Sequence, residues 1–590
     1  MSGALKHFTG FSNKKWTTYA VPVLFSLSMK IILFCYWFNS PFRFFSNITG
    51  LDMQTHMAYA RRFLEGGIEF SIYRLIAGAI YLILGDRYFV EGVVATQMLS
   101  GVVVTFLIVF LMLHLTRDRL AAMLAGIFAA TYSTAAIYEC FILPESIFMC
   151  VCCITLAVPF YISCRRRFSP LPLFLSGIAC TLPLVTKITG SLLSFFFVTL
   201  VVMMISRKRS VPASSKRRLC MFFSAGIAAI IIPVSAYNVA RGFSFLPLPS
   251  SPNFSYVFKL GATENIKSLS LTEKTPSNEQ AKPSTTGGFT RKLANYGEKF
   301  LMIFHHYEVP NNINCYFVRY FLFPLNLMLK STVLIPLAIA GMLILLFRQK
   351  LMTRYFILFL YLACIALPMI IFVPLARYRL SLFPVFCVFA AYPMVFLRAK
   401  FAGYNNKFIA PVLYFVLLTA LAYLIGGHSD ENYFRSQDFV SYGIGQEKSG
   451  RFDSDSVEVS YRTAFLMAPE SLSAAIHLSN FLMKKGDFTE AEMILSSFHR
   501  QYPDNMVIAV NYAASLLGTG HPSDAEKVLL KIGEPRSGVT RTRYFYQMGE
   551  ALRLQGRNRE AVESFSKAID NASTKEEVEI IRAALKNIRQ

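Results

Sequence analysis

Charged residues are scarce in this chain, and acids are scarcer than bases. Asp, Glu, Lys and Arg together make up 16% of the 590 residues, whereas soluble domains carry about a quarter. The 59 basic residues outnumber the 35 acidic ones, which gives a formal net charge of +24. A basic chain could bind nucleic acid, but here the basic residues cluster between apolar runs. We therefore expect no nucleic-acid partner.

Cysteine is also sparse, and its placement excludes a disulfide framework. None of the 11 cysteines follows Cys387, and most lie inside or beside apolar runs. They show neither the pattern of small secreted domains nor the paired spacing of a zinc site. Long apolar runs are likewise missing beyond residue 425. The chain therefore divides into an apolar part and a soluble tail.

Apolar residues are in excess: they make up 54% of the sequence, which includes 54 Phe. They form runs of roughly 17 to 22 residues, and about 20 helical residues cross a hydrocarbon core of about 30 Å. We therefore predict an all-α chain with a polytopic membrane domain of about eleven spans over 19–425, after a cytoplasmic N-terminus (1–18). The predicted spans are 19–38, 93–115, 120–137, 143–163, 170–187, 188–205, 219–240, 327–347, 355–373, 380–397 and 407–425.

Basic residues distinguish one alternating set of loops from the other. Since cytoplasmic loops are enriched in Lys and Arg, we place this basic set and the N-terminus in the cytoplasm of a cell whose inner membrane holds the spans. The long loops 39–92 and 241–326 and the C-terminal tail then lie outside, in the periplasm of a bacterium. Within the first of these loops, the apolar piece 72–84 is short and contains Arg74, so we predict an interfacial or re-entrant helix. The basic loops lie near residues 6–15, 117–119, 165–167, 207–218, 348–354 and 398–407.

The tail repeats at a spacing of 34 to 36 residues, marked by Ala491, Ala525 and Ala561. Small residues let two antiparallel helices approach, and such hairpins stack because one hairpin cannot bury its own apolar face. The pattern resembles tetratricopeptide repeats, and we assign 438–590 to an α-solenoid after a linker at 426–437. Its groove would bind a protein partner or an acceptor; the structural alternative is a passive spacer. Further matching positions are Tyr461, Ala464, Leu478, Leu482, Leu495, Phe498, Leu516, Leu529, Leu552 and Phe565.

Charged residues at the predicted outer ends of the spans are candidates for function, because ionisable groups near a membrane are costly to retain. Asp52 is the first, at the start of a helix that also carries Tyr59; a helix N-cap is its structural alternative. Acids and cations at one membrane mouth suit a reaction with a phosphate leaving group, in which a carboxylate takes a proton and cations stabilise the phosphate. The adjacent His305 and His306 do not favour a metal site, since neighbours rarely point at one ion. The other candidates are Glu145, Lys187, Glu308, Asn311, Arg377 and Arg379.

Several of these motifs resemble those of GT-C class membrane glycosyltransferases, in particular the aminoarabinose and protein mannosyltransferase-like group. The resemblance covers roughly residues 15–400. It is carried by the outer-loop Asp52 before a helix, the stretch 74–87, the segment 143–146, Lys187 and the segment 377–384. The loop segments 252–254 and 308–312 are similar to motifs of members that carry tetratricopeptide tails.

The resemblance implies transfer of a sugar from a polyprenyl-phosphate donor to an envelope lipid, glycan or protein, on the outer face and with inversion. By position, Asp52 would be the general base, and Lys187, Arg377 and Arg379 would hold the donor phosphate. Glu145, with Glu308, Tyr59 and Asn311 nearby in the motifs, would position substrate or a divalent cation such as Mg²⁺ or Mn²⁺. Many family members carry a second acid near the first, whereas Met53 and Gln54 follow Asp52 here, so metal dependence stays open.

Two other functions remain as alternatives. A non-enzymatic membrane scaffold would use the tail to assemble an envelope complex. A transporter of lipid-linked sugars would need charges deep within several spans, and Lys30 is the main mid-span charge.

Overall fold

The structure is a computed structural model that describes residues 13–48, 51–62, 69–164, 169–208, 212–246, 289–347, 349–400, 433–536 and 538–589. Over these ranges the regular secondary structure is helical, which confirms the all-α prediction. The chain divides into two compact units, one ending at Phe434 and the other beginning at Arg435. Each unit is described separately.

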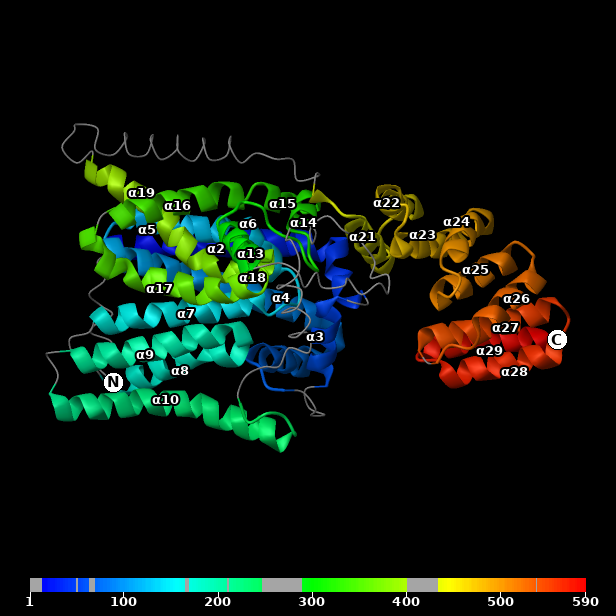
Figure 1. Cartoon of the computed structure of the whole chain (residues 1–590), viewed down its shortest axis with the longest axis horizontal. Helices are drawn as coiled ribbons and strands as arrows, with labels where there is room; N and C mark the ends of the chain where they lie inside the picture. Colours follow the sequence, from blue (N-terminus) through cyan, green and yellow to red (C-terminus); the bar gives the residue numbers. More distant parts are fainter. Residues whose placement is uncertain are drawn as a thin grey trace. The chain divides into compact units, whose positions relative to one another are not determined.

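Apolar helices that run side by side make up the first unit (Figure 1). Within the described ranges, six are long and apolar enough to cross a membrane. Four others have 10–17 residues and are shorter than a full span. The six long stretches belong to α2 (Asn13–Phe38), α4 (Ile72–Thr116), α7 (Glu145–Cys164), α9 (Ser191–Arg207, with the turn from Ile188), α10 (Ala213–Ala240) and α19 (Phe383–Lys400, with the helical residues from Ala376). The shorter ones are α5 (Arg119–Thr131), α8 (Pro170–Thr186), α16 (Ser331–Phe347) and the part Tyr355–Ile371 of α17 (Gln349–Ile371).

The prediction of eleven spans is therefore only partly supported. The predicted span 120–137 is wrong in its extent, because α5 ends at Thr131, where the extended backbone of Tyr132 (φ −68°, ψ 111°) begins a break before α6 (Ser133–Glu139). The break is held by Leu329, whose carbonyl accepts the Ser133 N–H (2.9 Å) and whose N–H donates to the Thr131 carbonyl (2.8 Å). The predicted span 407–425 lies outside the described residues.

The apolar piece 72–84 is helical, as predicted, but it is joined to the following span. Both belong to α4, whose helical geometry is interrupted at Gly85 (φ 63°, ψ −175°). This left-handed φ favours glycine, so the sequence marks the bend. The interfacial position of the piece remains a prediction. The second long loop, 241–326, contributes α13 (Phe289–Ile303), α14 (Cys315–Phe321) and α15 (Phe323–Asn326), while its middle, 247–288, which includes the motif 252–254, lies outside the described residues.

Two ion pairs in the first unit neutralise charged side chains on its apolar helices and at their ends. Lys30 Nζ lies 2.6 Å from Glu139 Oε2, and both side chains are almost fully buried. Asp118 caps α5 by accepting the N–H groups of residues 120 and 121, and it also accepts two hydrogen bonds from Arg398 at 2.7 and 2.8 Å. Mid-helix Lys30 is thus neutralised by a partner, as a low-dielectric environment requires.

The second unit is a run of antiparallel helical hairpins followed by a final helix, in agreement with the tetratricopeptide-like prediction. The three marker residues Ala491, Ala525 and Ala561 are each 0% exposed, so they allow the close helix contact expected of small residues. The first helix of the unit, α21, begins at Ser436, two positions before the predicted boundary. Most of the predicted linker (426–432) lies outside the described residues. The helices are α21 (Ser436–Ser449), α22 (Ser454–Met467), α23 (Leu472–Lys485), α24 (Phe488–Gln501), α25 (Met506–Gly518), α26 (Pro522–Ile532), α27 (Val539–Leu554), α28 (Asn558–Asn571) and α29 (Lys575–Arg589).

Candidate active site

One cavity of the first unit brings together five of the predicted site residues. Its volume is about 380 Å³. It lies where the short helix α3 (Asp52–Arg61), the start of α7, the end of α8 and the four-residue helix α18 (Ala376–Arg379) meet. The predicted residues that line it are Asp52, Tyr59, Glu145, Lys187 and Arg377.

Each acid of this cavity forms an ion pair with a cation. Arg377 Nη1 lies 2.7 Å from Asp52 Oδ2, and Lys187 Nζ lies 2.9 Å from Glu145 Oε1. Arg377 Nε is 4.0 Å from the same oxygen of Glu145. The Glu145 side chain is 3% exposed, whereas that of Asp52 is 45% exposed. Each of the two carboxylates is therefore paired with a cation, and a third cation, Arg74, also lines the cavity.

The structure answers the question of whether Asp52 is an N-cap. Leu51 occupies the cap position of α3 without a side-chain cap hydrogen bond, and Asp52 is the first helical residue. Its carboxylate is directed to Arg377 instead. It still lies in the first turn, where the helix dipole favours a negative charge.

The electrostatic surroundings keep Asp52 ionised. Burial alone would raise the pKa of its carboxyl, but the charge and hydrogen bond of Arg377 lower the pKa below the ordinary value. A carboxylate with a lowered pKa is a weak base. A ligand that drew Arg377 away would raise this pKa and make Asp52 a stronger base.

His56 is a cavity residue whose role the sequence did not reveal. It lines the cavity one helical turn after Asp52, and its ring packs against Tyr73 with centroids 5.2 Å apart. Its Nδ1 is buried and has no hydrogen-bond partner among the residues that the structure describes. Burial lowers the pKa of His56 to about 4, against the opposing pull of Glu145 and Asp52, so the ring is neutral at physiological pH. The i, i+4 spacing from Asp52 was the available signal.

Tyr378 is a second residue that was not anticipated. Its hydroxyl accepts a hydrogen bond of 2.8 Å from Arg377 Nη2. Lys187 Nζ lies 4.7 Å from the centre of its ring, and the Arg377 guanidinium carbon lies 4.8 Å from it. The aromatic face thus holds both cations on one side of the cavity.

The residues that line the cavity differ in character. An apolar wall comes mainly from the end of α17 and the residues that follow it, whereas the aromatic and polar lining comes from α3 and the start of α4. The charged residues Asp52 and Arg74 belong to these last two elements, and Glu145, Lys187 and Arg377 come from the start of α7, the end of α8 and α18. The apolar residues are Phe148, Ile365, Pro368, Met369, Phe372 and Val373, and the aromatic or polar ones include His56, Tyr59, Tyr73 and Arg74.

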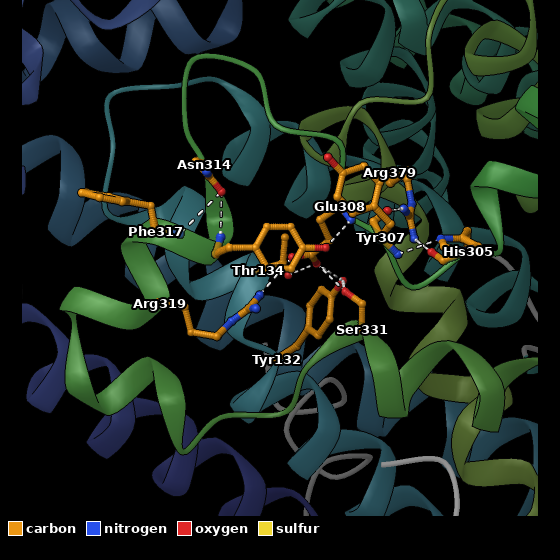
Figure 2. Close-up of polar contacts among 11 residues, drawn as sticks. Tyr132, Thr134, His305, Tyr307, Glu308, Asn314, Phe317, Arg319, Ser331 and Arg379 are labelled. Carbon is orange, nitrogen blue, oxygen red and sulfur yellow. Dashed lines mark hydrogen bonds and ion pairs between the residues drawn. The ribbon is translucent and has the colours of Figure 1, made fainter. Parts of the chain in front are cut away.

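Glu308 and Arg379 are not among the residues that line this cavity, and their roles in substrate binding stay predictions. Glu308 is buried and forms an ion pair of 2.9 Å with Arg319, and it also accepts hydrogen bonds from Thr134 and Ser331 (Figure 2). Burial raises the pKa of Glu308, but Arg319 and these hydroxyls outweigh that effect, so the net pKa is lowered. A carboxylate whose oxygens are engaged in this way is not available to a ligand.

Arg379 is likewise engaged with the protein rather than with the cavity. Its guanidinium donates hydrogen bonds to the backbone carbonyls of Tyr307 and His305 (Figure 2). Asn311 contributes a backbone hydrogen bond to the Ile313 carbonyl and is not among the lining residues. All three residues thus lie outside the cavity lining, and the hydrogen bonds described for them are made within the protein.

The described residues do not fit a divalent cation. They contain no group of three or more His, Cys, Asp and Glu side chains that could hold one. Asp52 and Glu145 each pair with a cationic side chain, which would compete with a metal for the carboxylate oxygens. His305 and His306 stack on each other with ring centroids 4.3 Å apart rather than converging on a point.

Comparison with known proteins leaves the site to be interpreted from its own geometry. No family model and no curated protein matches the sequence. Among solved structures, the crystal structure of yeast Tom70 matches with 12% sequence identity, over 87% of this chain and 95% of that chain, at a TM-score of 0.18. A TM-score this low carries no argument about function or about the whole fold.

Proposed function

We propose that this chain is a GT-C class membrane glycosyltransferase that moves one sugar from a polyprenyl-phosphate donor to an envelope acceptor. The observation that carries the proposal is the convergence of Asp52, Glu145, Lys187 and Arg377 on one cavity. These residues were selected from the sequence as a base, a positioning acid and two phosphate-binding cations. Their grouping is what such a reaction needs.

The cavity walls support a ligand that is both amphiphilic and anionic. A prenyl chain fits the apolar wall from α17, because burying its methylene groups is favourable by about 0.8 kcal/mol each. Lys187 and Arg377 suit a phosphate, and Arg377 can donate two parallel hydrogen bonds. The hydroxyls and aromatic faces of Tyr59 and Tyr73 suit a sugar ring.

In the proposed step, the acceptor hydroxyl oxygen attacks the anomeric carbon of the donor and forms the new glycosidic bond. The bond from this carbon to the phosphate oxygen breaks, and the phosphate leaves with the bonding electrons. Arg377 and Lys187 stabilise the charge that grows on the phosphate. Asp52 takes the proton from the acceptor hydroxyl. Attack opposite the leaving group inverts the anomeric carbon.

The proposed location is the inner membrane, with the site and the tail on the outer face. The six long apolar helices support a membrane protein, and the distribution of basic loops supports this orientation. The helical repeats of the tail suit a protein partner or a protein acceptor.

The test is transfer from a panel of radiolabelled polyprenyl-phosphate sugars by the purified protein, in membranes that contain candidate acceptors. Asp52→Asn should abolish transfer while the protein stays folded, because the side chain changes little in size. Asp86→Asn is the matched control, since Asp86 also pairs with an arginine (Arg61, 2.8 Å) but is 62% exposed and lies outside the cavity lining. Wild-type turnover by Asp52→Asn would refute the base assignment. No transfer from any donor by a folded wild type would favour the scaffold alternative.

A further inference from the structure

Arg377, the cation that contacts both cavity acids, lies in the first turn of a longer helical segment. Helix α18 has four residues, Ala376–Arg379, and continues through a 3₁₀ turn, Leu380–Leu382, into α19. The first N–H groups of a helical segment have no partner within it. Contacts with other parts of the chain therefore help to fix the position of this first turn.

Residues 305–309, which precede α14 in the chain, form hydrogen bonds with both ends of α18. The N–H of Ala376 donates to the carbonyl of Val309 at 3.1 Å. At the other end, Arg379 donates to the carbonyls of Tyr307 and His305. Arg377 lies between these two attachments, so the loop helps to fix its backbone position.

The loop is itself fixed by the carboxylate of Glu308. This side chain is 3% exposed, and a buried carboxylate is stable only when its oxygens are paired and hydrogen-bonded. Its partners come from separate elements: Arg319 on α14, Thr134 on α6 and Ser331 at the start of α16 (Figure 2). The Glu308 N–H also donates to the Tyr316 hydroxyl at 2.8 Å. Residues 305–309 are thus attached to the core of the unit.

We propose that Glu308 and Arg379 are positioning residues, which hold the loop backbone at 305–309 against α18 and thereby set the Arg377 guanidinium in the cavity. They act through Arg377 and touch neither the donor nor the acceptor. The consequence for phosphate binding rests on the proposed function; the attachment of α18 does not.

The first arm of the test reads the attachment without a ligand. Hydrogen exchange of the amides of α18 should speed up by about tenfold or more in Arg379→Met, because local opening becomes easier. Arg379→Lys keeps the charge but cannot reproduce the planar fork that reaches two carbonyls, so it should rescue this exchange only in part. Arg398→Met is the control: Arg398 also forms two hydrogen bonds but pairs with Asp118 at the start of α5, so exchange in α18 should not change.

The second arm reads the consequence for the reaction. Arg379→Met should raise the KM for the lipid-phosphate donor by about tenfold, as expected for a weakened charge-assisted hydrogen bond. In an Arg377→Gln background the same substitution should add little, because the two residues act as one unit. Glu308→Gln should behave like Arg379→Met; if it fails to fold, Arg379→Met still decides the question.

The outcomes separate the two proposals. Unchanged exchange in α18 of Arg379→Met, or an effect on KM that is fully additive with Arg377→Gln, would overturn the positioning role. Faster exchange in α18 alone would support it even if the wild type transfers no sugar. Failure of transfer in the wild type counts against the proposed function only.

Discussion

Breaking the Lys187–Glu145 ion pair from one side should destabilise the protein, and removing the second charge should restore most of the loss. Lys187→Met leaves Glu145, whose side chain is 3% exposed, with Arg377 Nε at 4.0 Å as its nearest remaining cation. Losing one partner of a buried pair costs about 3–5 kcal/mol, and we expect about 3 kcal/mol here because Arg377 remains. Glu145→Gln added to Lys187→Met removes the uncompensated charge. The double variant should therefore be more stable than Lys187→Met alone.

The assay is unfolding of the purified protein in detergent, for the two single variants and the double variant. All three variants should lose sugar transfer. The double variant alone should regain stability without regaining activity. Arg61→Met is the control: it breaks the exposed pair with Asp86 (48% and 62% exposed), for which less than about 1 kcal/mol is expected. A Lys187→Met variant as stable as the Arg61→Met control would refute the view that Glu145 is buried as a charge. Wild-type transfer by the double variant would remove both residues from the mechanism.

Three further predictions concern the cavity and its support. Arg377→Gln removes the main cation that lowers the Asp52 pKa, so the acidic limb of the pH–rate profile should move to higher pH while the rate falls; an unmoved limb would contradict the assignment of Asp52. His56 has a pKa of about 4 in the folded protein and about 6.5 when unfolded, so only the unfolded state takes up this proton between those values. Stability should fall by up to about 3 kcal/mol as the pH is lowered through that window, and His56→Gln should flatten the fall in pH-dependent unfolding. In Gly341→Ala the new Cβ would lie 1.9 Å from the Phe389 carbonyl oxygen, so separating α16 from α19 should cost about 1–3 kcal/mol, seen as a lower melting temperature.

The sequence predicted the repeats of the tail well, because their pattern is local. Ala491, Ala525 and Ala561 recur at nearly constant spacing, and each lies in the same packing environment within its hairpin. Each hairpin packs mainly on its neighbours, so the residues that make these contacts recur in the sequence at the spacing of the repeat.

The candidate site could be predicted as a set of residues but not as a geometry. Charges at the ends of apolar spans are costly, and this cost singled out Asp52 and Arg377, which are 325 positions apart in the chain yet hydrogen-bonded. The same reasoning selected Glu308 and Arg379, which are buried in a separate network. Sequence position reveals that a charge needs a partner, whereas the tertiary fold decides whether the partner is a ligand or the protein itself.

The charge balance of the cavity links donor binding to activation of the base, if the proposed function holds. At rest, Asp52 and Glu145 offset Arg377 and Lys187, and Asp52 is a weak base because Arg377 lowers its pKa. A donor phosphate must compete with Asp52 for the Arg377 guanidinium. Success in that competition places the leaving group beside its cations and at the same time raises the Asp52 pKa, since the charge that lowered it is now shared with the phosphate. Asp52 therefore becomes an effective base only when a donor is present, and the acceptor hydroxyl is activated only when there is a sugar to receive.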